Sequence, residues 1–358
     1  MPNGGHERLE SIQVLRAVAA LAVIWSHSTL ELLRFTDVDL RSFSSLSSMG
    51  RTGVDIFFVI SGFVMVYVSS RHFQKGHEAS RFLFKRVVRV VPIYWFYTSL
   101  ILGVALLAPN LLRNFELSWA HVAASYFFIP FPTPGDDGFH PLLGVGWTLN
   151  YEMFFYVLFA PFLFLAREKG ILALAALFVA IVLAGQLLTP SAGAFWFWSR
   201  PIILEFAGGC LLALAFLRGW RFSTLWAVLI VASGLGWLVY VAEYWNEGGL
   251  DARLFVTGVP SILIVAGIAL RRRTGDDGKT SMASRAFVHL GDASYSLYLV
   301  HMFVIRTLTK LVPVDLLGVI YPFVYMIAVF ALCILAATLS YRLIERPANS
   351  GLRKWANI

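Results

Sequence analysis

The sequence has few charged residues and only two cysteines. Asp, Glu, Lys and Arg make up 14% of the 358 residues, whereas hydrophobic residues make up 58%, and the mean hydropathy is +0.71. Cys210 and Cys333 both lie inside apolar runs, which excludes a disulfide framework by number and a cysteine-based metal site by spacing. A soluble domain of this length could not bury so much apolar surface. The composition therefore predicts an all-α, polytopic transmembrane helical bundle.

Motifs of several soluble enzyme classes are also missing. No Walker A loop, dinucleotide-binding glycine fingerprint, HExxH zinc helix or G-x-S-x-G nucleophile elbow occurs. The histidines His27, His121, His140 and His301 are scattered over separate segments, so we predict no metal site. The net charge of +8 would suit nucleic acid, but the basic residues occupy short loops between apolar runs. Positive-inside topology explains that placement better, so we expect membrane lipids as partners and no nucleic acid.

Ten apolar segments have about the 20 residues needed to span a bilayer. They are 12–31, 53–70, 92–109, 145–166, 170–188, 200–217, 223–243, 254–270, 290–310 and 319–341. With the N-terminus in the cytoplasm, all but eight of the 29 Lys and Arg fall on the cytoplasmic side. The eight exceptions are Arg34, Arg41, Arg51, Arg113, Arg200, Arg253, Arg306 and Lys310. This asymmetry predicts ten spans with both termini cytoplasmic.

The whole chain, 1–358, reads as one membrane domain. Residues 1–11 form a cytoplasmic N-terminal segment and 342–358 a cytoplasmic tail. The first apolar run is too long for a cleavable signal peptide and no small-residue cleavage site follows it, so we interpret it as a retained helix. Residues 119–131 are apolar but too short to span, and we expect a re-entrant or interfacial segment on the outer side.

Arg16 and His27 lie eleven residues apart in the first apolar segment. Eleven helical residues complete roughly three turns, so the two side chains point the same way, about 16 Å apart along the axis. A cation and an imidazole on one face of a membrane helix are costly and are usually retained for function. We therefore expect the chemistry on this face.

Other polar residues within the spans are candidates for partners of His27. Asp55 opens the second span, Glu152 lies in the fourth and His301 in the ninth. An unpaired charge at mid-bilayer costs roughly 2.5–3.5 kcal/mol, so each needs a partner or a wet cavity, and a simple interhelical polar contact is the alternative to a catalytic role. His27 has the chemistry of a general base. Either Glu152 or Asp55 could orient its imidazole as a carboxylate does in a triad, and the sequence leaves open which.

A basic stretch follows the second span. Arg86 and Arg89 are neighbours on a helix surface, and Arg81 and Lys85 lie one turn earlier. Such a cluster suits the phosphates of a polyanion. It equally suits positive-inside anchoring with anionic lipid headgroups, and both interpretations remain open at this point.

Six stretches of the sequence carry a family resemblance. They are IQVLRAVAALAVIWSH (12–27), GVDIFFVISGF (53–63), RFLFKRVVRVVPIYW (81–95), WTLNYEMFFY (147–156), SYSLYLVH (294–301) and ERP (345–347). In this order they make the chain resemble the acyltransferase-3 family of integral membrane acyltransferases, and within it the exopolysaccharide O-acetyltransferases of succinoglycan type. The resemblance covers essentially the whole chain, although the SGNH hydrolase-like domain that many relatives carry at the C-terminus is not expected here.

The resemblance implies roles for particular residues. His27 is the expected catalytic residue, and Arg16, Arg86 and Arg89 are expected to engage the acyl donor, most often acetyl-CoA. Glu152 matches a family acidic position, although the commoner pattern has two adjacent Glu where this chain has Tyr151 and Glu152. That departure favours the exopolysaccharide subgroup. With Glu152 we place Asp55 among the catalytic candidates, and Tyr151 and His301 among the residues that bind substrate or donor.

The resemblance also implies the reaction. We expect an acyl group to pass from acyl-CoA to a hydroxyl of an exopolysaccharide or cell-surface glycan, or of its lipid-linked precursor, in the bacterial inner membrane. Polysaccharide-biosynthesis machinery is the expected partner, and no permanently bound cofactor is expected. Direct transfer is our hypothesis, and an acyl-histidine relay remains open. The alternative function is a transporter or flippase for a lipid-linked or polyanionic solute, against which stands the lack of a visible internal repeat.

Overall fold

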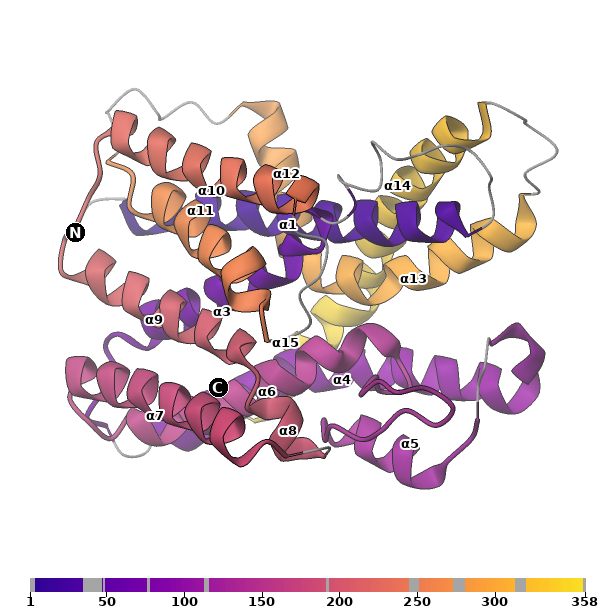
Figure 1. Ribbon diagram of the computed structural model, residues 1–358, viewed down its shortest axis with the longest axis horizontal. Coiled ribbons are helices and arrows are strands. Elements are labelled where there is room, and N and C mark those ends of the chain that lie inside the picture. The colour runs from indigo at the N-terminus through magenta and orange to yellow at the C-terminus, as the bar shows by residue number, and fades with distance from the viewer. Residues whose placement is uncertain are drawn as a thin grey trace. The chain divides into compact units, whose positions relative to one another are not determined.

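The computed structural model describes residues 4–34, 47, 49–75, 78–112, 116–190, 193–244, 251–272, 281–312 and 320–356, with side chains from residue 10 onward. Within these ranges the chain is helical apart from turns, short connections and the loop 127–143 (Figure 1). The described residues contain no extended strand, only an isolated parallel bridge between Phe222 and Arg271. The prediction of an all-α bundle is confirmed.

Each of the ten apolar segments marked in the sequence coincides with a helix. These helices are α1 (Gly4–Leu33), α3 (Thr52–Ser69), α4 (Glu78–Leu107), α6 (Trp147–Phe162), α7 (Arg167–Leu188), η3 with α9 (Pro201–Leu217), α10 (Thr224–Tyr244), η4 with α11 (Leu254–Ala269), α13 (Ser294–Leu311) and α14 (Tyr321–Ser340). Among the described residues, six helices are long and apolar enough to cross a membrane, namely those containing α1, α3, α4, α7, α10 and α14. Of the cations expected outside, Arg41 and Arg113 lie outside the described residues.

Hydropathy did not indicate two further helices, α12 (Met282–Asp292) and α15 (Arg346–Trp355). Both are amphipathic rather than apolar, and most of their side chains are exposed. The π-helical turn η7 (Tyr341–Glu345) joins α14 to α15, so that Tyr321–Trp355 is one continuous helix. The short segment expected at 119–131 contains the helix α5 (Trp119–Tyr126). Its relation to a membrane stays a prediction.

The chain divides into two compact units. The first comprises Met1–Tyr67 and Gly208–Tyr341, and the second comprises Val68–Ala207 and Arg342–Ile358. In the first unit, α1 packs against α12, α13 and α14, while α10 packs against α11. Two glycines allow close approach to α1, since a Cβ on Gly53 would meet the Ala19 carbonyl oxygen at 2.3 Å and one on Gly291 would meet that of Gln13 at 2.1 Å. Small residues of this kind are typical of helix contacts in membranes.

In the second unit, α4 packs against α6, α5 and α15, and α6 packs against α7. Aromatic rings fill the space between these helices. Phe159 contacts Phe82 with ring centroids 5.0 Å apart, and Phe155 stacks on Phe206 at 4.5 Å. The helices α4 and α6 both contain an internal proline, Pro92 and Pro161. This is tolerated in membrane helices, where neighbouring groups satisfy the freed carbonyls.

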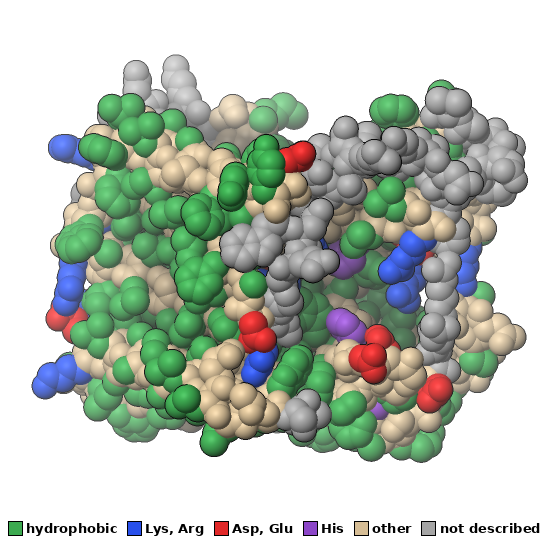
Figure 2. All heavy atoms as spheres, viewed as in Figure 1, with side chains coloured by type: hydrophobic (Ala, Val, Ile, Leu, Met, Phe, Trp, Pro, Cys, Tyr) green, Lys and Arg blue, Asp and Glu red, His purple; other side chains and the backbone are tan. Residues whose placement is uncertain are grey.

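The outer face of α10 is apolar. Figure 2 shows hydrophobic side chains gathered over this helix. Its exposed large hydrophobic residues are Leu225, Trp226, Val228, Leu229, Leu235, Trp237, Val239, Tyr240 and Tyr244. An exposed apolar face of this extent would be unfavourable in water and suits contact with lipid chains.

Candidate active site

The helix α1 presents Arg16 and His27 to α13. The Arg16 Nη2 donates to the Ser294 Oγ at 2.8 Å, and the His27 Nδ1 lies 3.3 Å from the His301 Nε2. The two helices therefore run parallel, as the first and ninth of a series of alternating spans would. The prediction that Arg16 and His27 point to the same side of their helix agrees with these contacts.

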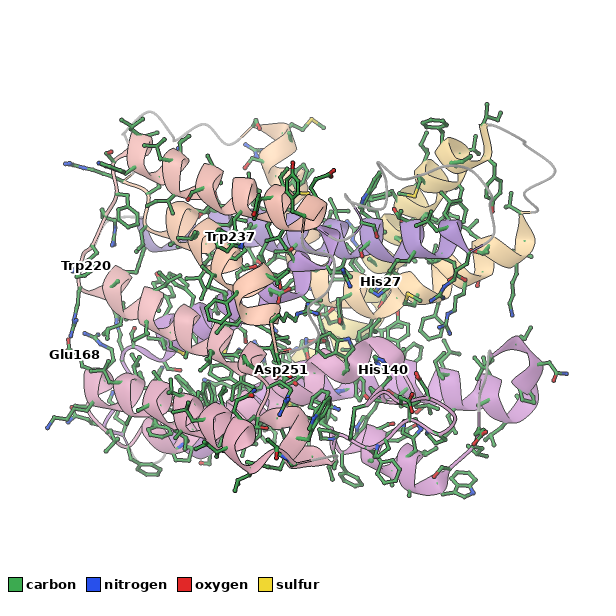
Figure 3. The ribbon with its side chains drawn as sticks, viewed as in Figure 1. His27, His140, Glu168, Trp220, Trp237 and Asp251 are labelled. Carbon is green, nitrogen blue, oxygen red and sulfur yellow. The ribbon has the colours of Figure 1, made fainter. Side chains whose placement is uncertain are left out.

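The hydrogen bonds of His27 assign its tautomer. Its Nδ1 lies 3.1 Å from the carbonyl oxygen of Val23, which can only accept, so Nδ1 carries the proton. His301 is assigned in the same way, because its Nδ1 lies 2.7 Å from the Tyr298 carbonyl oxygen and its Nε2 is left as an acceptor facing His27. The rings are tilted by 47° with centroids 5.0 Å apart. Figure 3 labels His27 among the side chains of the bundle. The Nε2 of neutral His27 therefore holds the lone pair that a general base requires.

Arg16 is connected to both sides of the α12–α13 junction, directly to Ser294 and through Gln13 to Asp292. Its Nη1 donates to the Gln13 Oε1 at 3.0 Å, and the Gln13 Nε2 donates to the Asp292 Oδ1 at 2.8 Å. The Ser294 hydroxyl, which accepts from the other guanidinium nitrogen, is fully buried. The bare Cα of Gly291 lets the end of α12 approach α1 closely enough for these bonds. Sequence reasoning missed Gln13 and Ser294, which carry no charge to signal a role.

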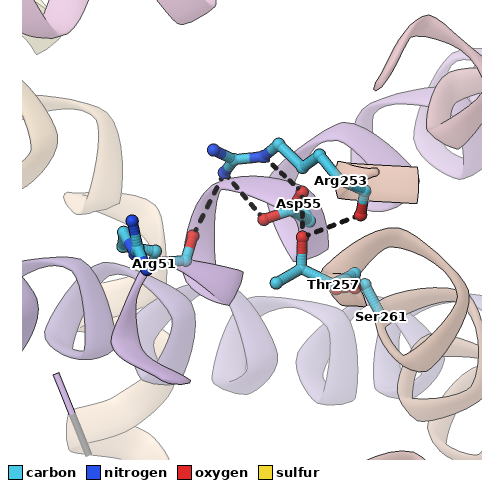
Figure 4. A network of polar contacts seen from close by, with 5 residues as sticks. All are labelled: Arg51, Asp55, Arg253, Thr257 and Ser261. Atoms are coloured by element: carbon cyan, nitrogen blue, oxygen red, sulfur yellow. Dashed lines mark hydrogen bonds and ion pairs between the residues drawn. The ribbon is translucent and has the colours of Figure 1, made fainter. Parts of the chain in front are cut away.

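Asp55 pairs with Arg253, as Figure 4 shows. The Arg253 Nε and Nη2 donate to the two carboxylate oxygens at 2.8 and 2.9 Å, and the Thr257 hydroxyl donates to Oδ1 at 2.8 Å. Thr257 lies in the π-helical turn η4, Leu254–Gly258. Asp55 is fully buried, and these contacts join α3 to η4. They give Asp55 a cation as its partner, whereas the contacts of His27 are with Val23 and His301. Its expected role in orienting His27 stays a prediction.

Glu152 lies in the second unit beside Arg86. The buried Tyr156 hydroxyl donates to the Glu152 Oε1, and both side chains interact electrostatically with Arg86. The guanidinium of Arg86 also lies over the Phe82 ring, 5.4 Å from its centroid. Among the described residues, the buried Arg86 Nε has no hydrogen-bond acceptor. The acidic position of the family pattern thus lies next to the arginine pair.

The C-terminal helix adds a cation to this region. The helix α15 packs against α4, and Arg353 interacts electrostatically with both Lys85 and Arg86. We call Arg81, Lys85, Arg86, Arg89 and Arg353 the basic cluster. From the sequence, 342–358 was expected only as a cytoplasmic tail, with no role for Arg353. The helical spacing of Leu352 and Trp355 beside Arg353 and Lys354 was the available signal.

Tyr151 is fully buried at the start of α6. Its hydroxyl donates to the Phe197 carbonyl oxygen at 2.6 Å, and its ring stacks on that of Phe197 with centroids 4.3 Å apart. These contacts hold α6 to α8 (Ala194–Trp198). The expected role of Tyr151 in binding donor or substrate stays a prediction.

The remaining histidines form no metal centre within the described ranges. There, no group of three or more His, Cys, Asp or Glu side chains is placed to hold a metal ion. His121 and His140 have a structural connection, because the His121 Nε2 lies 2.8 Å from the His140 carbonyl oxygen. Burial lowers the pKa of His140, and the nearby Asp136 opposes that effect.

Comparison with known proteins identifies the family of this chain. Residues 9–338 match the acyltransferase-3 family model, which is described as an acyltransferase domain. The chain belongs to the acyltransferase-3 family. It is an acyltransferase, and its family together with its long apolar helices makes it a multi-pass membrane protein.

Three relatives of this acyltransferase show the range of the family. The exopolysaccharide production protein ExoZ of Rhizobium meliloti (strain 1021) is 35% identical over 265 residues, covering 74% of this chain and 79% of ExoZ. The acyltransferase MdmB of Streptomyces mycarofaciens is 26% identical over 322 residues, 84% of this chain and 79% of MdmB. The peptidoglycan O-acetyltransferase OatA of Listeria monocytogenes is 26% identical over 372 residues, 94% of this chain but only 55% of OatA. No solved structure matches the chain.

Proposed function

We propose that this acyltransferase transfers acetyl from acetyl-CoA to a hydroxyl group of an exopolysaccharide or another cell-surface glycan, or of its lipid-linked precursor, with His27 as the general base. One observation carries the proposal. The His27 Nδ1 faces two acceptors, the Val23 carbonyl oxygen and the His301 Nε2, so the free lone pair is on Nε2. A base whose tautomer is held in this way is ready to accept a hydroxyl proton.

The reaction balances with His27 alone as the proton carrier. The acceptor oxygen attacks the thioester carbonyl carbon while its proton passes to the His27 Nε2. The resulting imidazolium is stabilised through Nδ1–H by the Val23 carbonyl. When the tetrahedral intermediate collapses, the carbon–sulfur bond breaks and the coenzyme A thiolate takes the proton back from Nε2. The products are the O-acyl ester and the free thiol, and no covalent acyl-enzyme is needed.

The basic cluster is the proposed donor site. Coenzyme A carries several phosphate charges, and arginine forks bind phosphate with good geometry. Gathering five cations around one part of α4 is unfavourable unless anions offset their repulsion. Glu78 beside Arg81 and Lys85, and Glu152 beside Arg86, supply only part of that charge. We assign Glu152 to ordering the arginines, and Arg16 to engaging the donor as the family resemblance implies.

The acceptor class is supported by the names of two relatives. One is an exopolysaccharide production protein and the other a peptidoglycan O-acetyltransferase, and both names concern glycans outside the cytoplasm. Acetyl-CoA is made in the cytoplasm, so a protein in the inner membrane is well placed to bring its acetyl group to such a glycan or its lipid-linked precursor. We propose that location, with both termini cytoplasmic and with the polysaccharide-biosynthesis machinery as the partner.

The test is transfer of labelled acetyl from acetyl-CoA to envelope polysaccharide in inverted membrane vesicles. Wild type is expected to incorporate label, and His27→Ala to lose incorporation by at least about 100-fold, since general-base catalysis contributes about 10²–10⁴-fold. His289→Ala removes an exposed histidine on α12 and is the matched control, expected to retain transfer. Label retained by His27→Ala would overturn the role of His27. No label in any correctly inserted variant would show that the donor is not acetyl-CoA or that the acceptor is not this polysaccharide.

A further inference from the structure

His301 is a buried imidazole to which the proposed reaction assigns no substrate contact. It lies on α13, is fully buried, and uses both ring nitrogens. Its Nδ1 donates to the Tyr298 carbonyl oxygen at 2.7 Å, and its Nε2 faces the His27 Nδ1 at 3.3 Å. Neither nitrogen is left for a substrate, so His301 can act on the reaction only through His27.

We propose that His301 is the positioning residue of His27 and takes the place that a carboxylate has in a catalytic triad. The three groups form a chain in which the Tyr298 carbonyl accepts from the His301 Nδ1–H. The His301 Nε2 shares the His27 Nδ1–H with the Val23 carbonyl oxygen, at 3.3 and 3.1 Å respectively. This inference rests on the proposed function, because it requires His27 to be the base.

A neutral imidazole suits this position better than a carboxylate on physical grounds. A buried carboxylate in a membrane bundle needs a compensating cation, and Asp55 in the same unit is bound to Arg253 in just this manner. His301 adds no charge in the resting state. When His27 accepts the hydroxyl proton at Nε2, its Nδ1–H becomes a charge-assisted donor, and the lone pair on the His301 Nε2 strengthens that bond. The proton returns to the leaving thiolate, so His301 ends each cycle unchanged.

The orientation of His301 is fixed by its own surroundings. Its backbone is helical, so the Tyr298 carbonyl lies one turn earlier on α13 and holds the ring by an i, i+3 bond. The sulfur of the buried Cys333 on α14 contacts the His301 carbonyl oxygen at 4.0 Å. The tilt of 47° between the rings lets the His301 Nε2 approach the His27 Nδ1 without stacking. These contacts place an acceptor next to the His27 Nδ1.

The experiment compares His301→Gln with His301→Asn in purified, detergent-solubilised full-length protein. Both variants are neutral and polar, but only the longer glutamine amide reaches the position of Nε2. His301→Gln is expected to keep kcat within about fivefold of wild type. His301→Asn is expected to lose about 10- to 100-fold in kcat, a range taken by analogy from partners that orient metal-bound histidines, with KM for acetyl-CoA unchanged.

Two kinetic outcomes would overturn the inference. One is that both variants retain the wild-type kcat while His27→Ala does not, which would leave the proposed function standing. The other is a raised KM for acetyl-CoA at unchanged kcat, which would make His301 a donor-binding residue. The proposed function is tested separately, because it depends on the transfer activity of His27→Ala and not on that of the His301 variants.

A spectroscopic measurement tests the same inference if the asparagine variant fails to accumulate. Nuclear magnetic resonance of wild-type protein with ¹⁵N,¹³C-labelled histidine reports the tautomer of each ring, and the His27→Gln and His301→Gln variants assign the two signals among the eight histidines. Both rings are expected as the Nδ1–H tautomer, whereas free histidine in water favours Nε2–H. An Nε2–H tautomer on His301 would overturn the inference.

Discussion

Arg253 binds the fully buried carboxylate of Asp55 in a bidentate manner, with its Nε and Nη2 at 2.8 and 2.9 Å from the two oxygens. The pair connects α3 to the π-helical turn η4, 198 residues away in the chain. Arg253 is the counter-charge that a carboxylate in an apolar span requires. The two-point contact allows its contribution to the stability of the fold to be tested.

Asp55→Asn is expected to destabilise the protein by about 3–5 kcal/mol, because it leaves the Arg253 guanidinium without its counter-charge. The measurement is the midpoint of thermal unfolding of purified protein in detergent, which should fall. The double variant Asp55→Asn/Arg253→Gln should recover part of the loss, since it removes both charges together.

Asp136→Asn is the matched control for this substitution, because Asp136 is exposed in the loop before α6. It should change stability by no more than about 0.5 kcal/mol. An unchanged unfolding midpoint in Asp55→Asn would show that the ion pair contributes nothing to the fold.

Gln13→Leu is expected to raise KM for acetyl-CoA by about tenfold or more while changing kcat little. The substitution removes the acceptor for the Arg16 Nη1 and the link from Arg16 to Asp292, and a hydrogen bond to a charged group contributes about 1.5–3 kcal/mol. Steady-state kinetics with varied acetyl-CoA measures the effect. Gln186→Leu, the same change at an exposed position on α7, should behave as wild type. A Gln13→Leu protein with normal KM would separate Arg16 from donor binding.

Arg86→Ala and Arg89→Ala are each expected to weaken donor binding, with a smaller effect on kcat. If the arginines bind phosphates, the affinity of wild type should fall as ionic strength rises, and the difference between wild type and the double variant should shrink because salt screens the attraction. Direct binding of acetyl-CoA to purified protein at several salt concentrations tests this. If the double variant retained its affinity for acetyl-CoA, the two arginines would serve only to orient the protein in the membrane.

Arg353→Gln should follow the same pattern more weakly, because Arg353 interacts with Lys85 and Arg86 from α15. Arg353→Lys keeps the charge and should retain most of the affinity. Arg346→Gln removes an equal charge at the other end of α15 and is the control for net charge alone. Equal losses in Arg346→Gln and Arg353→Gln would exclude a specific contribution of Arg353.

The local sequence pattern was sufficient to predict those features that depend on a single segment. The ten apolar runs correspond to ten helices because the length and hydropathy of a run depend only on its own residues. The same applies to α1, where spacing alone placed Arg16 and His27 on one face, and to the pair Arg86 and Arg89. The helices α12 and α15 were missed because their apolar residues form only a stripe, which a search for continuous apolar runs does not detect.

Partnership between distant segments required the tertiary structure. His301 lies 274 residues from His27 and Arg253 lies 198 residues from Asp55, and no periodicity in the sequence relates either pair. From the sequence, Glu152 or Asp55 could orient His27, and that role stays a prediction for both. The packing of α13 against α1 places an imidazole beside His27, which no pattern in the sequence indicated. Hydropathy determines which segments become helices, but which faces meet depends on the shapes of all the helices together, and only the folded chain decides that.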